Sequence, residues 1–222
     1  MKRERLFARI PTPCVSKHGI GADDILRVPA CPELIADLLD CLGSDDELDL
    51  VFALMFAEHL GTRPDFYGLA QPSLPALTAA IRSALAQPSM RVRACAIRAF
   101  VAYRSCFDDY SVAMRLYLCS TDPQIRGEAL IAAPTFLPAK DLAALLPFRE
   151  DLGVSETVGM GGPLRYLTRD LALAIAERIA GKQFSAGDCF EERDGSRVSW
   201  RSWSAFTHWL ESKKKWRFFG VC

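Results

Sequence analysis

Three stretches of similar pattern decide the fold of this chain: VRACAIRAF at residues 92–100, IRGEALIAA at 125–133 and TRDLALAIA at 168–176. In each stretch an arginine is followed three residues later by alanine and four residues later by an aliphatic residue; the arginines are Arg93, Arg126 and Arg169. The first two arginines lie 33 residues apart and the next two 43 residues apart. Such a period is typical of stacked helix pairs and is too long for a coiled coil. The sequence therefore predicts an all-α helical repeat protein.

Length and composition limit the class of protein. The 222 residues suffice for a continuous core. Lysine plus arginine equals aspartate plus glutamate at 27 each, so no strong net field favours nucleic acid or an anionic membrane. The eight cysteines are dispersed along a chain too long to need disulfide staples, which favours a reducing compartment. Because no apolar run has the length of a signal peptide core or a membrane span, we expect a cytoplasmic protein.

The positions of proline and glycine predict three segments. Residues 1–31 lack a sustained helical period and are expected to form an irregular N-terminal arm. Residues 32–181 form the predicted helical repeat domain. Residues 182–222 supply a loop and a terminal capping helix that belong to the same domain.

About four helix pairs are expected between residues 32 and 181. The predicted helices span 32–42, 48–60, 73–87, 90–104, 108–119, 123–133, 140–148 and 163–180. Ser44 and Glu47 have the spacing of a capping box, and Ser89 and Asp122 are predicted helix caps. Residues 151–162 are expected to form a longer glycine-containing loop.

The pattern changes after residue 181. The turn-forming residues that follow allow either an irregular loop or a short hairpin around Asp194 and Gly195. A helical period then resumes, with a stripe formed by Trp203, Phe206, Trp209 and Leu210. This terminal helix is expected to close the open end of the last repeat.

The repeated stretches resemble the second helix of HEAT-like repeats, which combines a capping Asp or Ser, valine or isoleucine, arginine, alanine and an aliphatic residue. The resemblance covers residues 73–181 and, less fully, 32–61. It implies a right-handed HEAT-like α-solenoid of about four helix pairs plus a terminal helix. It also implies that the alanine and aliphatic positions pack between helices, and that the arginine pairs with an aspartate of the adjacent repeat. The same apolar spacing also fits an unrelated helical bundle.

A second resemblance lies near the C-terminus. The stretch RIAGKQFSAG, followed by tryptophans and WLE, is similar to the terminal segment of many bacterial HEAT-like proteins. In those proteins a tryptophan-containing helix caps the solenoid. Here an insertion separates Phe184 from Trp200.

Side chains suited to catalysis or metal binding are sparse. His18, His59 and His208 form no HxxxH or HExxH pattern, and no two cysteines form CxxC. Cys14 lies four residues from His18, but a catalytic dyad requires a base fixed beside the thiol. The glycines of VGMGGP at 158–163 lack the lysine of a P-loop. We therefore predict no catalytic residue, no metal and no cofactor.

Four charged residues are candidates for contact with a partner. Arg91 and Arg98 are seven residues apart and hence near one face of their helix. Because second helices line the concave side of a HEAT-like solenoid, the resemblance implies a shared partner-binding surface formed by Arg91, Arg98, Glu128 and Arg165. A solvated helix face explains these charges equally well. The basic run KKKWR at 213–217 fits either contact with phosphate or an acidic protein, or compensation of the helix dipole.

These observations predict a non-enzymatic module that binds another protein through a concave helical surface, with an immunity or inhibitor role toward a toxin or enzyme as one form. The alternative is a nucleic-acid-binding protein resembling the HEAT-like alkylpurine DNA glycosylases, which the balanced charge and Glu128 disfavour. A third hypothesis is an enzyme acting on a pigment or metabolite within the same scaffold. Neither nucleic acid nor a membrane is an expected partner.

Overall fold

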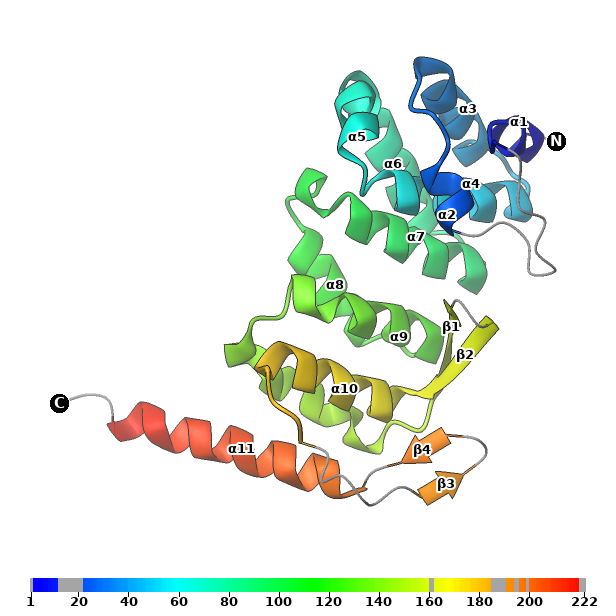
Figure 1. Ribbon diagram of the computed structural model, residues 1–222. Helices are drawn as coiled ribbons and strands as arrows, with labels where there is room; N and C mark the ends of the chain where they lie inside the picture. The colour runs from blue at the N-terminus through cyan, green and yellow to red at the C-terminus, as the bar shows by residue number, and fades with distance from the viewer. Residues whose placement is uncertain are drawn as a thin grey trace. The chain divides into compact units, whose positions relative to one another are not determined.

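The computed structural model describes residues 2–11, 22–159, 162–184, 191–193, 196–198 and 200–219. This part of the chain is mostly helical, which confirms the all-α class (Figure 1). The chain divides into two compact units, Met1–Tyr110 and Ser111–Cys222, whereas one continuous domain was predicted from residue 32 onward.

The first unit consists of helices. They are α1 (Arg3–Phe7), α2 (Ala22–Leu26), α3 (Pro32–Leu42), α4 (Glu47–Leu60), α5 (Pro64–Ala70), η1 (Gln71–Ser73), α6 (Leu74–Leu85), α7 (Met90–Ala102) and η2 (Arg104–Cys106), and α8 (Tyr110–Leu118) begins at its last residue. Helix α4 packs against α3 and α7, and α6 packs against α7. The predicted helix at 32–42 is thus confirmed, and those at 48–60, 73–87 and 90–104 are confirmed to within two residues.

Local hydrogen bonds explain where two of these helices begin. The hydroxyl of Ser89 accepts a hydrogen bond from the backbone N–H of Val92, as predicted for the cap of α7. The predicted capping box at Ser44 is wrong, because Asp46 is the cap of α4 and its carboxylate accepts the N–H of Asp49 at 3.0 Å. Asp46 immediately precedes the helix, so its short side chain reaches the third free N–H, whereas Ser44 lies two residues too early.

The core of the first unit is aromatic at its centre. Phe56, Phe66, Phe100 and Tyr103 are fully buried. The ring of Phe100 lies 4.3 Å from that of Phe107 and 5.2 Å from that of Tyr110, between ring centroids. Ala96 of the repeated pattern is fully buried as well, which confirms its predicted core position.

The N-terminal arm is more ordered than predicted. Helices α1 and α2 both lie within the first 31 residues, which were expected to be irregular. Helix α1 packs against α3 and α4; Leu6 on this helix is buried, and so is Ile10, which follows it. A five-residue helix has no stability of its own, so tertiary contacts that no local pattern reveals must hold it.

The second unit combines helices with two hairpins. Its elements are α8, α9 (Pro123–Ala132), η3 (Ala133–Thr135), η4 (Ala139–Glu150), β1 (Val154–Gly159), β2 (Gly162–Leu167), α10 (Thr168–Ala180), β3 (Glu191–Arg193), β4 (Ser196–Val198) and α11 (Trp200–Phe219). Asp122 caps α9, as predicted, by accepting the N–H groups of Gln124 and Ile125 at 2.8 and 3.4 Å. Ala129 and Ala172 of the repeated pattern are fully buried.

Two predicted elements of this unit are wrong. Residues 154–159 and 162–167 form an antiparallel hairpin in which Val154 is opposite Leu167, where a loop and then a helix from Pro163 were predicted. Helix α10 consequently begins at Thr168. The element expected to be a helix at 140–148 is a 3₁₀-helix that contains Pro147, which lacks the N–H that a regular helix requires.

A close approach fixes the first hairpin to α9. A Cβ atom added at Gly127 would collide with the Cβ of Ser155, so glycine is required where β1 packs on the helix. Strands β3 and β4 confirm the hairpin option for the region of Asp194 and Gly195, although those two residues lie outside the described part of the chain.

The aromatic stripe of the terminal helix is confirmed. Trp203 and Phe206 are buried, and the ring of Phe184 lies 5.1 Å from that of Phe206 and 5.3 Å from that of Trp209, between centroids. Helix α11 contacts η4 and α10. The stripe therefore covers these two helices of the second unit, whereas the solenoid arrangement itself stays a prediction.

Candidate binding surfaces

The first two predicted contact residues lie on α7 in the first unit. Arg91 is exposed. Arg98 is half-buried, with its Nε 3.4 Å from the Oε2 of Glu58 on α4 and its Nη2 3.2 Å from the Sγ of Cys95. Arg98 is thus used at least in part to join α7 to α4.

The other two predicted residues belong to the second unit. Glu128 on α9 is 4% exposed, and its carboxylate accepts a hydrogen bond from the side chain of Gln124 at 3.1 Å. This burial disagrees with the solvent-facing position that was predicted for Glu128. Arg165 lies on β2 opposite Glu156, and its side chain lies outside the described part. A surface shared by all four residues stays a prediction.

An open pocket of about 390 Å³ lies in the second unit. Its lining comes from α8, α9, η4 and the residues that follow them: Arg115, Leu118, Cys119, Arg126, Ala144, Pro147, Phe148 and Asp151. Leu118, Ala144, Pro147 and Phe148 make much of the wall apolar. Such a pocket suits large apolar side chains with a few polar partners at the edge.

Two ion pairs hold the polar side of this pocket. The guanidinium of Arg126 donates to the carboxylate of Asp151 from Nε at 2.7 Å and from Nη2 at 2.9 Å, and its Nη1 donates to the carbonyl of Ser120 at 2.7 Å. Arg115 donates from Nη2 to Asp141 at 2.7 Å and is 42% exposed. Arg126 is therefore fixed by a nearly buried bidentate pair, whereas Arg115 stands at the rim.

Arg126 and Arg169 of the repeated pattern both have acidic neighbours in the second unit. Arg126 pairs with Asp151, as described above. Arg169 is buried, its backbone N–H donates to the carbonyl of Asp151 at 3.1 Å, and its Nε lies 3.5 Å from Asp170. Burial raises the pKa of Asp170 above its ordinary value, and the positive charge of Arg169 only partly opposes this effect.

Asp170→Asn is expected to stabilise the protein at pH 7. A carboxyl whose pKa is higher in the folded than in the unfolded state binds a proton more readily when folded, so its ionised form lowers stability at neutral pH. The gain should shrink as the pH falls through the folded-state pKa. Urea unfolding of the variant and the wild type between pH 4 and 7 measures this gain in the free energy of unfolding. A gain that does not change with pH would contradict a raised pKa of Asp170.

A pair of exposed aliphatic side chains lies on α8. Val112 is 63% exposed and Leu116 is 69% exposed, and they are one helical turn apart. Cys119, the residue that follows α8, is exposed and lines the pocket. The sequence carries a signal for this surface that was missed. Tyr110, Met114 and Leu118 have core spacing, so the residues two positions away from them must face outward.

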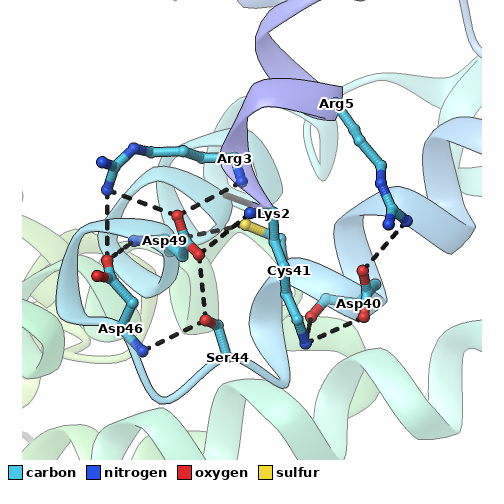
Figure 2. A network of polar contacts seen from close by, with 8 residues as sticks. All are labelled: Lys2, Arg3, Arg5, Asp40, Cys41, Ser44, Asp46 and Asp49. Carbon is cyan, nitrogen blue, oxygen red and sulfur yellow. Dashed lines mark hydrogen bonds and ion pairs between the residues drawn. The ribbon is translucent and has the colours of Figure 1, made fainter.

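A second set of polar contacts ties α1 to the first unit. Figure 2 shows the buried carboxylate of Asp49 receiving the backbone N–H groups of Lys2 and Arg3, at 3.3 and 3.4 Å. The hydroxyl of Ser44 donates to the same carboxylate at 3.1 Å, and Nη1 of Arg3 lies 3.3 Å from Asp46. Asp49, on α4, thus caps the N-terminal end of α1 across 46 to 47 residues of sequence.

Further cations of the arm contact acidic residues of α3. The Nζ of Lys2 lies 3.0 Å from a carboxylate oxygen of Asp40, and Nη1 of Arg5 lies 3.3 Å from the other oxygen (Figure 2). Arg9 pairs with Asp37 at 2.6 Å. Burial, followed by the nearby Asp49, raises the pKa of Cys41 to about 12, so this thiol stays protonated and donates to the carbonyl of Asp49.

The remaining sequence predictions concern metal binding, membrane spans and the isolated cysteine and histidine residues. The described part of the chain contains no cluster of three or more side chains that could hold a metal ion, and every helix there is too short or too polar to span a membrane. Cys14 and His18 lie outside the described residues, as do the side chains of 213–217. His208 is exposed on α11.

Comparisons of this chain with protein-family models, with curated proteins and with solved structures returned no match. The HEAT-like resemblance therefore stays an expectation from the sequence.

Proposed function

We propose that this chain is a protein-binding module whose second unit holds an apolar segment of its partner. The observation that carries the proposal is the exposed pair Val112 and Leu116 beside the apolar pocket. Two large aliphatic side chains exposed at adjacent turns of one helix lose contact with water when another protein covers them. Burying one such side chain fully contributes roughly 1.5–3 kcal/mol, enough for a few anchors to dominate the affinity.

The pocket supplies the specificity in this proposal. Its volume of about 390 Å³ lies at the lower end of the usual range for ligand pockets, which fits one or two large side chains of a partner. Arg115 at the rim offers hydrogen-bond donors, and Asp151 holds Arg126 in place. The finer role that we propose is inhibition of, or immunity toward, a toxin or enzyme. Such a role needs a rigid surface and no catalytic group.

Comparative affinity capture tests this function. Full-length tagged wild type, Leu116→Asp and Leu69→Asp are used as baits in nuclease-treated lysate of the source organism. Leu69 is the matched control, because it is an exposed leucine on α5 of the first unit. We expect one stoichiometric protein to be retained by wild type and Leu69→Asp and lost from Leu116→Asp. Equal recovery from all three baits would remove α8 from the site, and recovery of nucleic acid alone in untreated lysate would favour the nucleic-acid hypothesis.

A further inference from the structure

Residues 2–10, called the arm from here on, include α1, which packs on α3 and α4 of its own unit in the manner of a peptide ligand. Helix α1 has only five residues, and two aliphatic side chains four residues apart, Leu6 and Ile10, are buried. The surface beneath it is formed by α3 and α4. Because so short a helix is unstable alone, the receiving surface determines its conformation.

The charges of the arm and of the receiving surface are complementary. The arm carries Lys2, Arg3, Arg5 and Arg9, and these residues contact Asp37, Asp40, Asp46 and Asp49. The receiving surface is acidic well beyond these contacts, since residues 32–49, from the start of α3 into α4, contain no basic residue. The acidic residues of this stretch are Glu33, Asp37, Asp40, Asp45, Asp46, Glu47 and Asp49. Such a surface attracts basic segments and repels acidic ones.

The carboxylate of Asp49 also binds the backbone at the start of α1. Its buried carboxylate accepts two N–H groups at the start of α1 and lies 3.5 Å from the guanidinium of Arg3. Backbone N–H groups at the start of a helix are present whatever its side chains are. The site therefore selects a helix start, flanking cations and two aliphatic residues rather than one unique sequence.

We propose that the surface of α3 and α4 that α1 covers, called the groove below, is a binding site for a basic amphipathic helical segment of a partner protein, and that the chain's own residues 2–10 occupy it until the partner displaces them. This site lies in the first unit and is separate from the pocket of the proposed function. The covalent connection gives the arm a high effective concentration, so a partner segment must compete against it. Binding at this groove is thus gated by release of the arm.

Binding of a labelled peptide tests the groove. The probe has the sequence of residues 1–11, MKRERLFARIP. It is titrated against the full-length wild type and against full-length Leu6→Asp/Ile10→Asp, whose arm should leave the groove. We expect the peptide to bind the double variant at least about tenfold more tightly than wild type, because the arm no longer competes. A peptide in which the four cations are replaced by glutamate should lose binding, and added salt should weaken the parent peptide.

A further variant shows whether the peptide occupies the groove itself. Adding Asp49→Ala to the double variant should abolish peptide binding, since the cap for the helix start is removed. If the double variant does not fold, an excess of peptide on the wild type should instead accelerate amide exchange of its residues 3–10. A folded double variant that does not bind the peptide, or that binds the charge-reversed peptide equally, would overturn the proposal. Concentration-dependent dimers of the wild type that Asp49→Ala abolishes would assign the groove to a second copy of the chain and would also overturn the partner assignment.

Discussion

Phe100→Ala is expected to lower the free energy of unfolding by about 3–5 kcal/mol. Phe100 is fully buried on α7, the helix that packs against both α4 and α6. Its ring contacts those of Phe107 and Tyr110, so truncation of the side chain would leave a cavity beside these two rings. Neither neighbour can fill that space without leaving its own packing.

Urea unfolding followed by circular dichroism measures this loss. The matched control in the same unit is Leu69→Ala, which removes an exposed apolar side chain and should change stability by less than about 0.5 kcal/mol. Similar losses for the two variants, or an unchanged Phe100→Ala protein, would contradict the central place of Phe100 in the core.

Asp151→Ala is expected to cost about 3–5 kcal/mol, because it leaves a nearly buried cation without its carboxylate. Arg126 and Asp151 are only 15% and 16% exposed. The same carboxylate also accepts the backbone N–H of Gly153 at 2.9 Å, at the start of the chain segment that leads into β1. The loss therefore includes both the unpaired charge and a loosened connection between η4 and the hairpin.

Tryptophan fluorescence is a suitable probe, since all four tryptophans lie after residue 199 in the second unit. The double variant Arg126→Met/Asp151→Leu is the control, because it removes both charges at similar volume and should recover much of the loss. If Asp151→Ala unfolds like the wild type, or if the double variant is the least stable protein of the series, the pair does not fix this side of the pocket.

Local chemistry made much of the helical framework predictable. Ser89 and Asp122 cap the helices that they were predicted to cap, because a side-chain oxygen and the next free N–H groups lie within a few residues. Ala96 and Ala129 are buried at the repeated positions, because helical periodicity fixes which residues share a face.

The hairpin β1–β2 was not predictable from the same signals. Its glycines and proline, at 159, 162 and 163, were interpreted as loop residues, although the strands pair across them. Sheet formation depends on cross-strand partners and on packing against α9, which a local pattern does not contain. Helix α5 was missed for a related reason, since Gly68 weakens the local helical signal and the burial of Phe66 compensates.

The candidate sites could be predicted only in part from the sequence. The exposed pair on α8 follows from its offset from the core spacing, but the pocket requires η4 and α9 to come together. Glu128 was predicted on a surface because second helices line the concave side of HEAT-like solenoids, yet it is buried with a hydrogen bond from Gln124. The docking of α1 joins residues more than 40 positions apart, and only charge complementarity could have suggested it.

Site-specific photocross-linking tests the central claim, binding of a partner protein at α8, most directly. A photoreactive amino acid is placed at Leu116 in the full-length protein within its own cells, and at Leu69 in a parallel control. Both side chains are exposed, so both positions accept the probe without disturbing the core. We expect one discrete protein adduct from position 116 that position 69 does not give. No adduct at 116, or the same adducts from both positions, would contradict binding at α8.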